Sequence, residues 1–196
     1  MSLGKHLSGE EANISIIGAF GVLFGIPAGD TILKFLPIYK NYQASTLQNK
    51  LNEYMSGIDR MTPENRSKLR NKIETNRNFK RDVVSVLLEM VDNTCTDMNI
   101  DVLCNLTHAL AEGHISTDDF YRLSLALRRC IYSDLENLEK YVFDDKGFGY
   151  IDETNSSSFA LHSAGLLYMP VFGGNYNFVM NDLGEKMVKF GLKKSI

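Results

Sequence analysis

The residues best suited to bind a metal ion lie between positions 95 and 114. Cys95, Cys104, His108 and His114 are separated by eight, three and five residues. Zinc sites usually contain two cysteines separated by about two to four residues, and no such pair is present here. Helical spacing places Cys104 and His108 on one face, whereas Cys95 falls in a turn. We therefore interpret the cysteines as buried residues and the histidines as helix-end residues, and we expect no metal and no cofactor.

Two further patterns carry chemical residues without completing a site. Cys130 follows Arg128 and Arg129, which would lower the pKa of its thiol, although a cysteine inside a helix more often packs. Residues 144–155 have Gly and Ile at two EF-hand positions, but three ligand positions depart from that pattern. The sequence has no nucleophile elbow, kinase motif, phosphate-binding loop or dinucleotide loop. We assign no catalytic residue.

Charge is unevenly distributed along the chain. The 196 residues carry a net charge of −3, which excludes a polyanion binder driven by bulk charge. Residues 41–82 hold nine Lys/Arg against five Asp/Glu, whereas residues 83–154 hold five against fourteen. Such runs usually form solvated helix faces, but a local basic helix over residues 60–81 stays open as a nucleic-acid contact. Its candidate contact residues are Arg66, Lys68, Arg70 and Lys72.

The N-terminal region contains a stretch without charge, residues 12–29. Its 18 residues reach the lower limit for a membrane-spanning helix. Gly21 and Gly25 form a G-x-x-x-G pair, which lets two helices approach closely in lipid. A membrane contact and a buried or oligomeric helix of a soluble protein are both open. The candidate contact residues are Gly18, Phe20, Gly21, Phe24 and Gly25.

The rest of the chain is dominated by helical periodicity. Apolar residues recur at intervals of three and four over 45–58, 79–91, 100–111 and 116–143. Thr62 and Pro63 predict the start of a polar helix that runs to about Ile73. Gly113 predicts a helix C-cap, and Ser116 with Asp119 predicts a capping box at the start of a long helix to about Phe143.

The last part of the chain predicts a helix, a β-hairpin and a helix. Residues 158–167 are apolar on one side through Phe159, Leu161, Ala164 and Leu167. Two β-prone runs flank Gly173-Gly174-Asn175, and Asn181-Asp182 caps the final helix. About 35 residues resemble the C-terminal half of winged-helix domains. The resemblance rests on Gly165-Leu166-Leu167, Tyr176-Asn177-Phe178 and Leu183-Gly184-Glu185.

In the winged-helix family, the helix before the hairpin often reads the DNA major groove. Here that helix has no Lys or Arg, and neither does the hairpin tip. Contacts with phosphate normally need these residues. The resemblance therefore implies a fold, and it favours protein contact or a structural role over DNA reading.

These observations predict a mainly α protein, a helical bundle with an apolar N-terminal segment and a small winged-helix-like C-terminal module. The expected domains are residues 1–40, 41–145 and 146–196. The leading hypothesis is a non-enzymatic protein that docks on a membrane or a protein partner, a second copy included, through its N-terminus. In type it resembles small bacterial or phage accessory proteins such as exclusion or immunity factors.

The expected location is the cytoplasm, with attachment to the inner face of the membrane if residues 12–29 meet it. The positive-inside rule supports this orientation, since lysines follow the segment and glutamates precede it. Two alternatives belong to other classes. One is a soluble nucleic-acid-associated regulator that uses the basic helix over residues 60–81, and the other is an enzyme whose site is assembled across helices.

Overall fold

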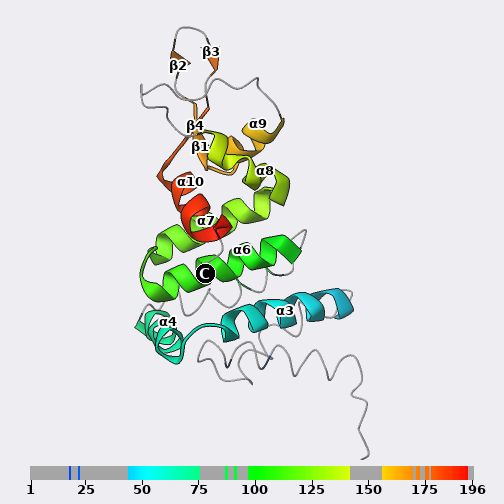
Figure 1. Ribbon diagram of the computed structural model, residues 1–196, viewed down its shortest axis with the longest axis vertical. Helices are drawn as coiled ribbons and strands as arrows, with labels where there is room; N and C mark the ends of the chain where they lie inside the picture. The colour runs from blue at the N-terminus through cyan, green and yellow to red at the C-terminus, as the bar shows by residue number, and fades with distance from the viewer. Residues whose placement is uncertain are drawn as a thin grey trace, which may run out of the picture. The chain divides into compact units, whose positions relative to one another are not determined.

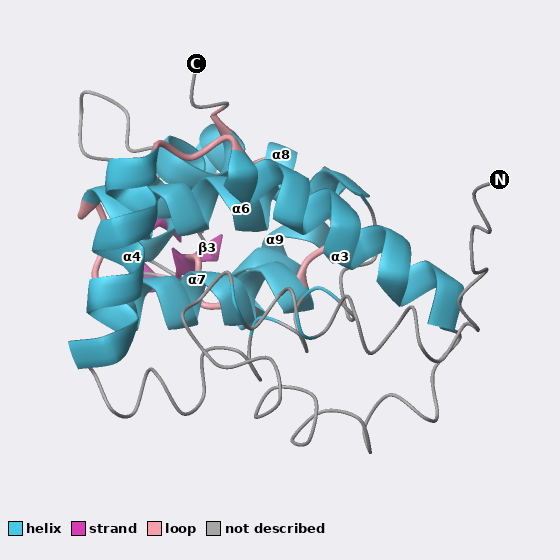
Figure 2. Ribbon diagram, turned by 90° about the horizontal axis from the view of Figure 1, so that it is seen from below, coloured by secondary structure: helices cyan, strands magenta, loops and turns pink. Residues whose placement is uncertain are grey.

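The protein is mainly helical in the computed structural model (Figure 1). The structure describes residues 44–75, 97–141, 156–169, 171–172, 175–176 and 178–193, and the single positions Gly18, Val22, Leu87 and Val91. The chain divides into two compact units, Met1–Asp92 and Asn93–Ile196. Helix accounts for most of the coloured ribbon in Figure 2, and strands are confined to a few short pieces.

In the first unit, two helices are joined by a tight turn. Helix α3 spans Ala44–Asp59 and helix α4 spans Pro63–Thr75. Thr62 Oγ1 accepts a hydrogen bond from the Asn65 amide at 3.2 Å, and Pro63 occupies the first helical position, as the sequence predicts. Apolar burial follows the helical period. The buried side chains are Leu51, Tyr54 and Ile58 on α3 and Leu69 and Ile73 on α4.

The second unit begins with helix α6, Asp97–Glu112. Gly113 follows it with a φ of 86°, a conformation that glycine adopts at least cost. The Gly113 amide donates to the Leu110 carbonyl and the His114 amide to the Ala109 carbonyl, which is a Schellman motif. The predicted C-cap is therefore confirmed, and the turn leads directly into the next helix.

Helix α7, Thr117–Arg129, begins at the predicted capping box but is shorter than expected. The backbone is extended at Cys130, and the chain continues as α8, Tyr132–Glu136, and a 3-10 turn η1, Leu138–Tyr141. The prediction of one helix to about Phe143 is wrong. Beyond the break, Leu135 and Leu138 are buried at helical intervals from the apolar positions of α7. Ile131, at the break itself, is exposed.

The C-terminal part has the predicted order of helix, hairpin and helix. Helix α9 spans Ser156–Ser163, and α10, Asp182–Lys186, continues as a π-helix η2, Met187–Leu192. Strand β1, Leu167–Tyr168, pairs antiparallel with β4, Val179–Met180, and β2, Val171–Phe172, pairs with β3, Asn175–Tyr176. Figure 1 shows β2 and β3 at the end of this unit farthest from α6.

The second unit is held together mainly by the C-terminal helix. Element η2 packs along α6, and Asn105 Nδ2 donates to the Gly191 carbonyl at 2.8 Å. A Cβ on Gly191 would lie 3.1 Å from Val102, so the missing side chain permits this close approach. Helix α7 contacts α6, α9 and α10. The bundle helices α6 and α7 and the C-terminal module therefore share one core.

Candidate interaction surfaces

The junction between α9 and the hairpin is fixed by Gly165. Its φ is 81°, its amide donates to the His162 carbonyl, and the Leu166 amide donates to the Leu161 carbonyl. This is a second Schellman motif, and the apolar pair that usually accompanies it is present as the fully buried Leu161 and Leu166. Gly165 therefore ends α9 and turns the chain into β1.

The junction between the hairpin and α10 is fixed by Asn181 and Gly184. Asn181 Oδ1 accepts from the Gly184 amide at 2.9 Å, and its Nδ2 donates to the Gly165 carbonyl at 2.8 Å. A Cβ on Gly184 would collide with the Leu166 carbonyl oxygen and lie 2.6 Å from Met180 Cγ. One asparagine thus caps α10 and ties it to the end of α9.

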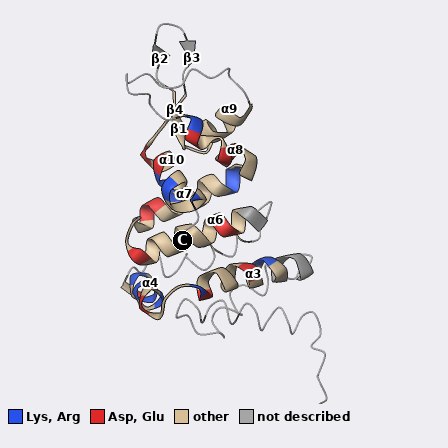
Figure 3. Ribbon diagram, in the orientation of Figure 1, with Lys and Arg blue, Asp and Glu red and all other residues tan. Residues whose placement is uncertain are grey.

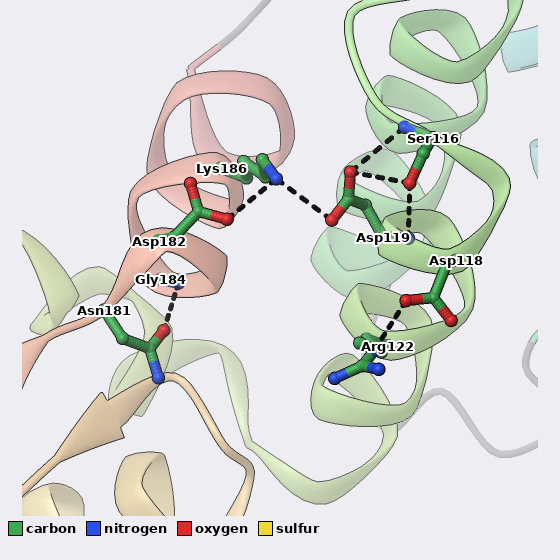
Figure 4. Close-up of polar contacts among 8 residues, drawn as sticks. All are labelled: Ser116, Asp118, Asp119, Arg122, Asn181, Asp182, Gly184 and Lys186. Carbon is green, nitrogen blue, oxygen red and sulfur yellow. Dashed lines mark hydrogen bonds and ion pairs between the residues drawn. The ribbon is translucent and has the colours of Figure 1, made fainter.

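A polar cluster joins the start of α7 to α10 (Figure 4). Lys186 Nζ lies 3.0 Å from Asp119 Oδ1 and 2.8 Å from Asp182 Oδ2, and the amide and hydroxyl of Ser116 both donate to Asp119 Oδ2. Burial opposes ionisation of Asp119, but the hydrogen bonds from Lys186 and Ser116 outweigh it and lower its pKa. Hydrogen bonds to Asp182 and Asp119 raise the pKa of Lys186.

The directions of these pKa shifts define the pH range in which the cluster of Lys186, Asp119 and Asp182 stabilises the fold. A lowered carboxyl pKa gives stability that is present above the unfolded value, about 3.8, and is lost as the pH falls through the folded value. A raised lysine pKa gives stability that is present below about 10.5 and is lost as the pH rises through the folded value. The cluster is fully charged across the neutral pH range, so its polar groups stabilise the fold there.

The outer face of α9 carries no charge. Phe159 is 51% exposed, and its ring meets the buried ring of Phe178 edge-on, with 5.4 Å between centroids. His162 also contacts Phe178, and its Nδ1 donates to the Leu167 carbonyl at 3.1 Å. Arg129 reaches the C-terminal end of this helix, with Nη1 3.4 Å from the Ser163 carbonyl. The half-exposed aromatic ring therefore rests on the buried ring of Phe178.

The prediction that Phe159 lies on the same side of the helix as Leu161 and Ala164 is wrong. The structure buries Leu161 and Ala164 but exposes Phe159. At 100° per residue, Phe159 lies about 200° from Leu161 around the helix. The spacing of two residues was therefore the signal that could have identified Phe159 as an outward residue.

The predicted basic contact residues all lie on α4 (Figure 3), and helical spacing divides them between two faces. Helical spacing places Arg66 and Arg70 on one flank of the buried strip formed by Leu69 and Ile73, and Lys68 and Lys72 on the other. The face opposite the strip presents Glu64, Ser67 and Asn71.

Some of the positive charge on α4 is already paired. Arg66 Nη1 lies 3.2 Å from Asp59 Oδ1, and Lys68 Nζ lies 2.6 Å from Glu64 Oε1. The hydrogen bond and charge of Lys68 lower the pKa of Glu64, whereas burial lowers the pKa of Lys72. A phosphate backbone would have to compete with the two carboxylates for these cations.

The packing interpretation of Cys130 is confirmed, and the alternative of a thiol with a lowered pKa is wrong. The side chain is buried, and its Sγ donates to the Ala160 carbonyl at 3.9 Å. Burial, with the negative charge of Asp134, raises the pKa of this thiol to about 12. The neighbouring Arg128 and Arg129 lie in the last turn of α7, and both have exposed side chains. The thiol is therefore protonated and packed at neutral pH.

Among the described residues, no three His, Cys, Asp or Glu side chains converge as metal ligands. Within the same ranges, every helix is too short or too polar to cross a bilayer. Gly18 is buried in a helix, and Val22, one turn later, is 51% exposed. The other predicted N-terminal contact residues, Phe20, Gly21, Phe24 and Gly25, lie outside the described residues, as do Cys95 and most of residues 79–91.

Three comparisons with known proteins place these surfaces in no family. No family model, no curated protein and no solved structure matches the chain.

Proposed function

We propose that this protein is a non-enzymatic interaction protein whose C-terminal winged-helix-like module docks on another protein through the outer face of α9. The observation that carries the proposal is the half-exposed ring of Phe159 on a helix without Lys or Arg. Aromatic residues on apolar supports are typical anchors of protein interfaces. A DNA-reading helix would need cationic or hydrogen-bonding side chains toward the phosphates.

The residues behind the winged-helix resemblance support the same assignment. Gly165, Asn181 and Gly184 form the junctions between helices and hairpin, and Leu166 and Leu167 are buried. Their contacts with the rest of the module account for these motif residues without a ligand. The motif therefore supports a shared architecture and leaves function to the outer surface of α9.

The test compares Phe159→Ala with a matched control, Leu125→Ala, using the full chain as bait. Leu125 is also a half-exposed apolar residue, 46% exposed, but it lies on α7. Loss of an aromatic anchor costs about 2 kcal/mol, or about thirty-fold in affinity. We expect proteins captured by the wild-type chain to be retained by Leu125→Ala and strongly depleted by Phe159→Ala, and titration of a purified partner to give this ratio.

Two results would contradict the α9 surface. Equal loss of a partner in both variants would show that the contact is not centred on Phe159. Tight binding of a DNA duplex that is abolished by Phe159→Ala alone would assign the helix to nucleic acid. Unchanged circular dichroism and thermal midpoints within about 3 °C are required of both variants, because Phe159 also contacts the core ring of Phe178.

We propose a second contact at the N-terminus, on a membrane or a partner, supported by the uncharged residues 12–29 and their glycine spacing. The test compares the full chain with a chain lacking residues 1–40, by sedimentation with anionic vesicles and by light scattering. Vesicle binding or a larger oligomer that is lost on truncation supports the contact. Two equally soluble monomers that ignore vesicles would refute it.

A further inference from the structure

We draw no further inference here: the strongest candidate, the half-exposed Phe159 ring on the uncharged outer face of α9, belongs to the surface already proposed for docking, and nothing in the described part of the structure shows what covers it.

Discussion

A DNA-reading helix of a winged-helix domain combines positive charge with a neighbouring β-hairpin. Helices α4 and α9 each have one of these two properties. Helix α4 has four Lys and Arg residues, but they flank a buried strip, and two of them are paired with carboxylates. Helix α9 precedes a β-hairpin, as a recognition helix does in winged-helix domains, but it contains no Lys or Arg. Within the described residues, α4 has the charge and α9 has the neighbouring hairpin, and neither helix has both.

A count of basic residues and a fold resemblance are therefore separate pieces of evidence for DNA binding. Binding to phosphates needs several cations on one accessible face, which the described part of α4 does not present. Docking on a protein surface instead favours aromatic area with little charge, which α9 presents through Phe159. Substitutions at the glycines that support α9 and at the cations of α4 test this difference.

The largest effect on stability is expected from Gly184→Ala, which disrupts the packing of α10 against the turn that follows α9. The added Cβ meets a backbone oxygen, that of Leu166, as well as the Met180 side chain, so the hairpin or α10 must move. We expect a loss of about 3 kcal/mol in the free energy of unfolding, the upper range for overpacking. Urea denaturation measures it.

Glu185→Ala is the control for Gly184→Ala, because Glu185 is the next residue of α10 and is exposed. Its unfolding free energy is expected to change by less than about 0.5 kcal/mol. If Gly184→Ala were equally silent, the close packing of α10 on the α9–β1 turn would be wrong. The position of α9 relative to α10 would then also be wrong.

A smaller effect is expected from Gly165→Ala, because the space around this residue is open. No atom lies within 4 Å of a Cβ built at Gly165, so the cost is the positive φ alone. That conformation costs an L-residue about 1–2 kcal/mol. Gly165→Asn should lose less, since asparagine tolerates the left-handed region. Equal losses for Ala and Asn in urea denaturation would contradict the backbone origin.

These two glycines show what a sequence can predict about the module. The sequence predicts the cap at Asn181. The helical stretch expected over residues 158–167 runs past Gly165, although α9 ends at Ser163 and a glycine C-cap there follows a local rule. Gly184 follows no such rule, because its role depends on the Leu166 carbonyl, which is distant in the chain but close in space. Local rules predict ends of elements, and long-range contacts explain the remaining residues.

The candidate surface was less predictable than the fold. The charge-free character of α9 is evident in the sequence, but the outward position of Phe159 depends on where the helix begins and which face meets Phe178. The break at Cys130 was also hidden, because the apolar positions continue with a helical rhythm through α8 and η1. Periodicity identifies most of the buried residues here, with Ile131 as an exception, but it does not indicate whether one helix or three carry them.

The smallest effect is expected from the triple variant Arg66→Ala, Lys68→Ala and Arg70→Ala on α4. Exposed ion pairs contribute about 0–1 kcal/mol, so folding should change little. Since these side chains lie on two flanks of α4, we expect affinity for a random DNA duplex to change by less than about twofold at low salt, around 50 mM. Fluorescence anisotropy of a labelled duplex measures it.

The matched control removes the same charge from the other unit, as Arg122→Ala, Arg128→Ala and Arg129→Ala, whose arginines are also exposed. If three phosphate contacts were lost from α4 alone, the slope of log affinity against log salt would fall by about 2.7. That result, with an unchanged slope in the control, would make α4 a nucleic-acid contact in spite of its paired cations. Small and equal changes in both variants would show that α4 contributes only non-specific attraction to DNA. The effect would then depend on the number of cations removed and not on their position.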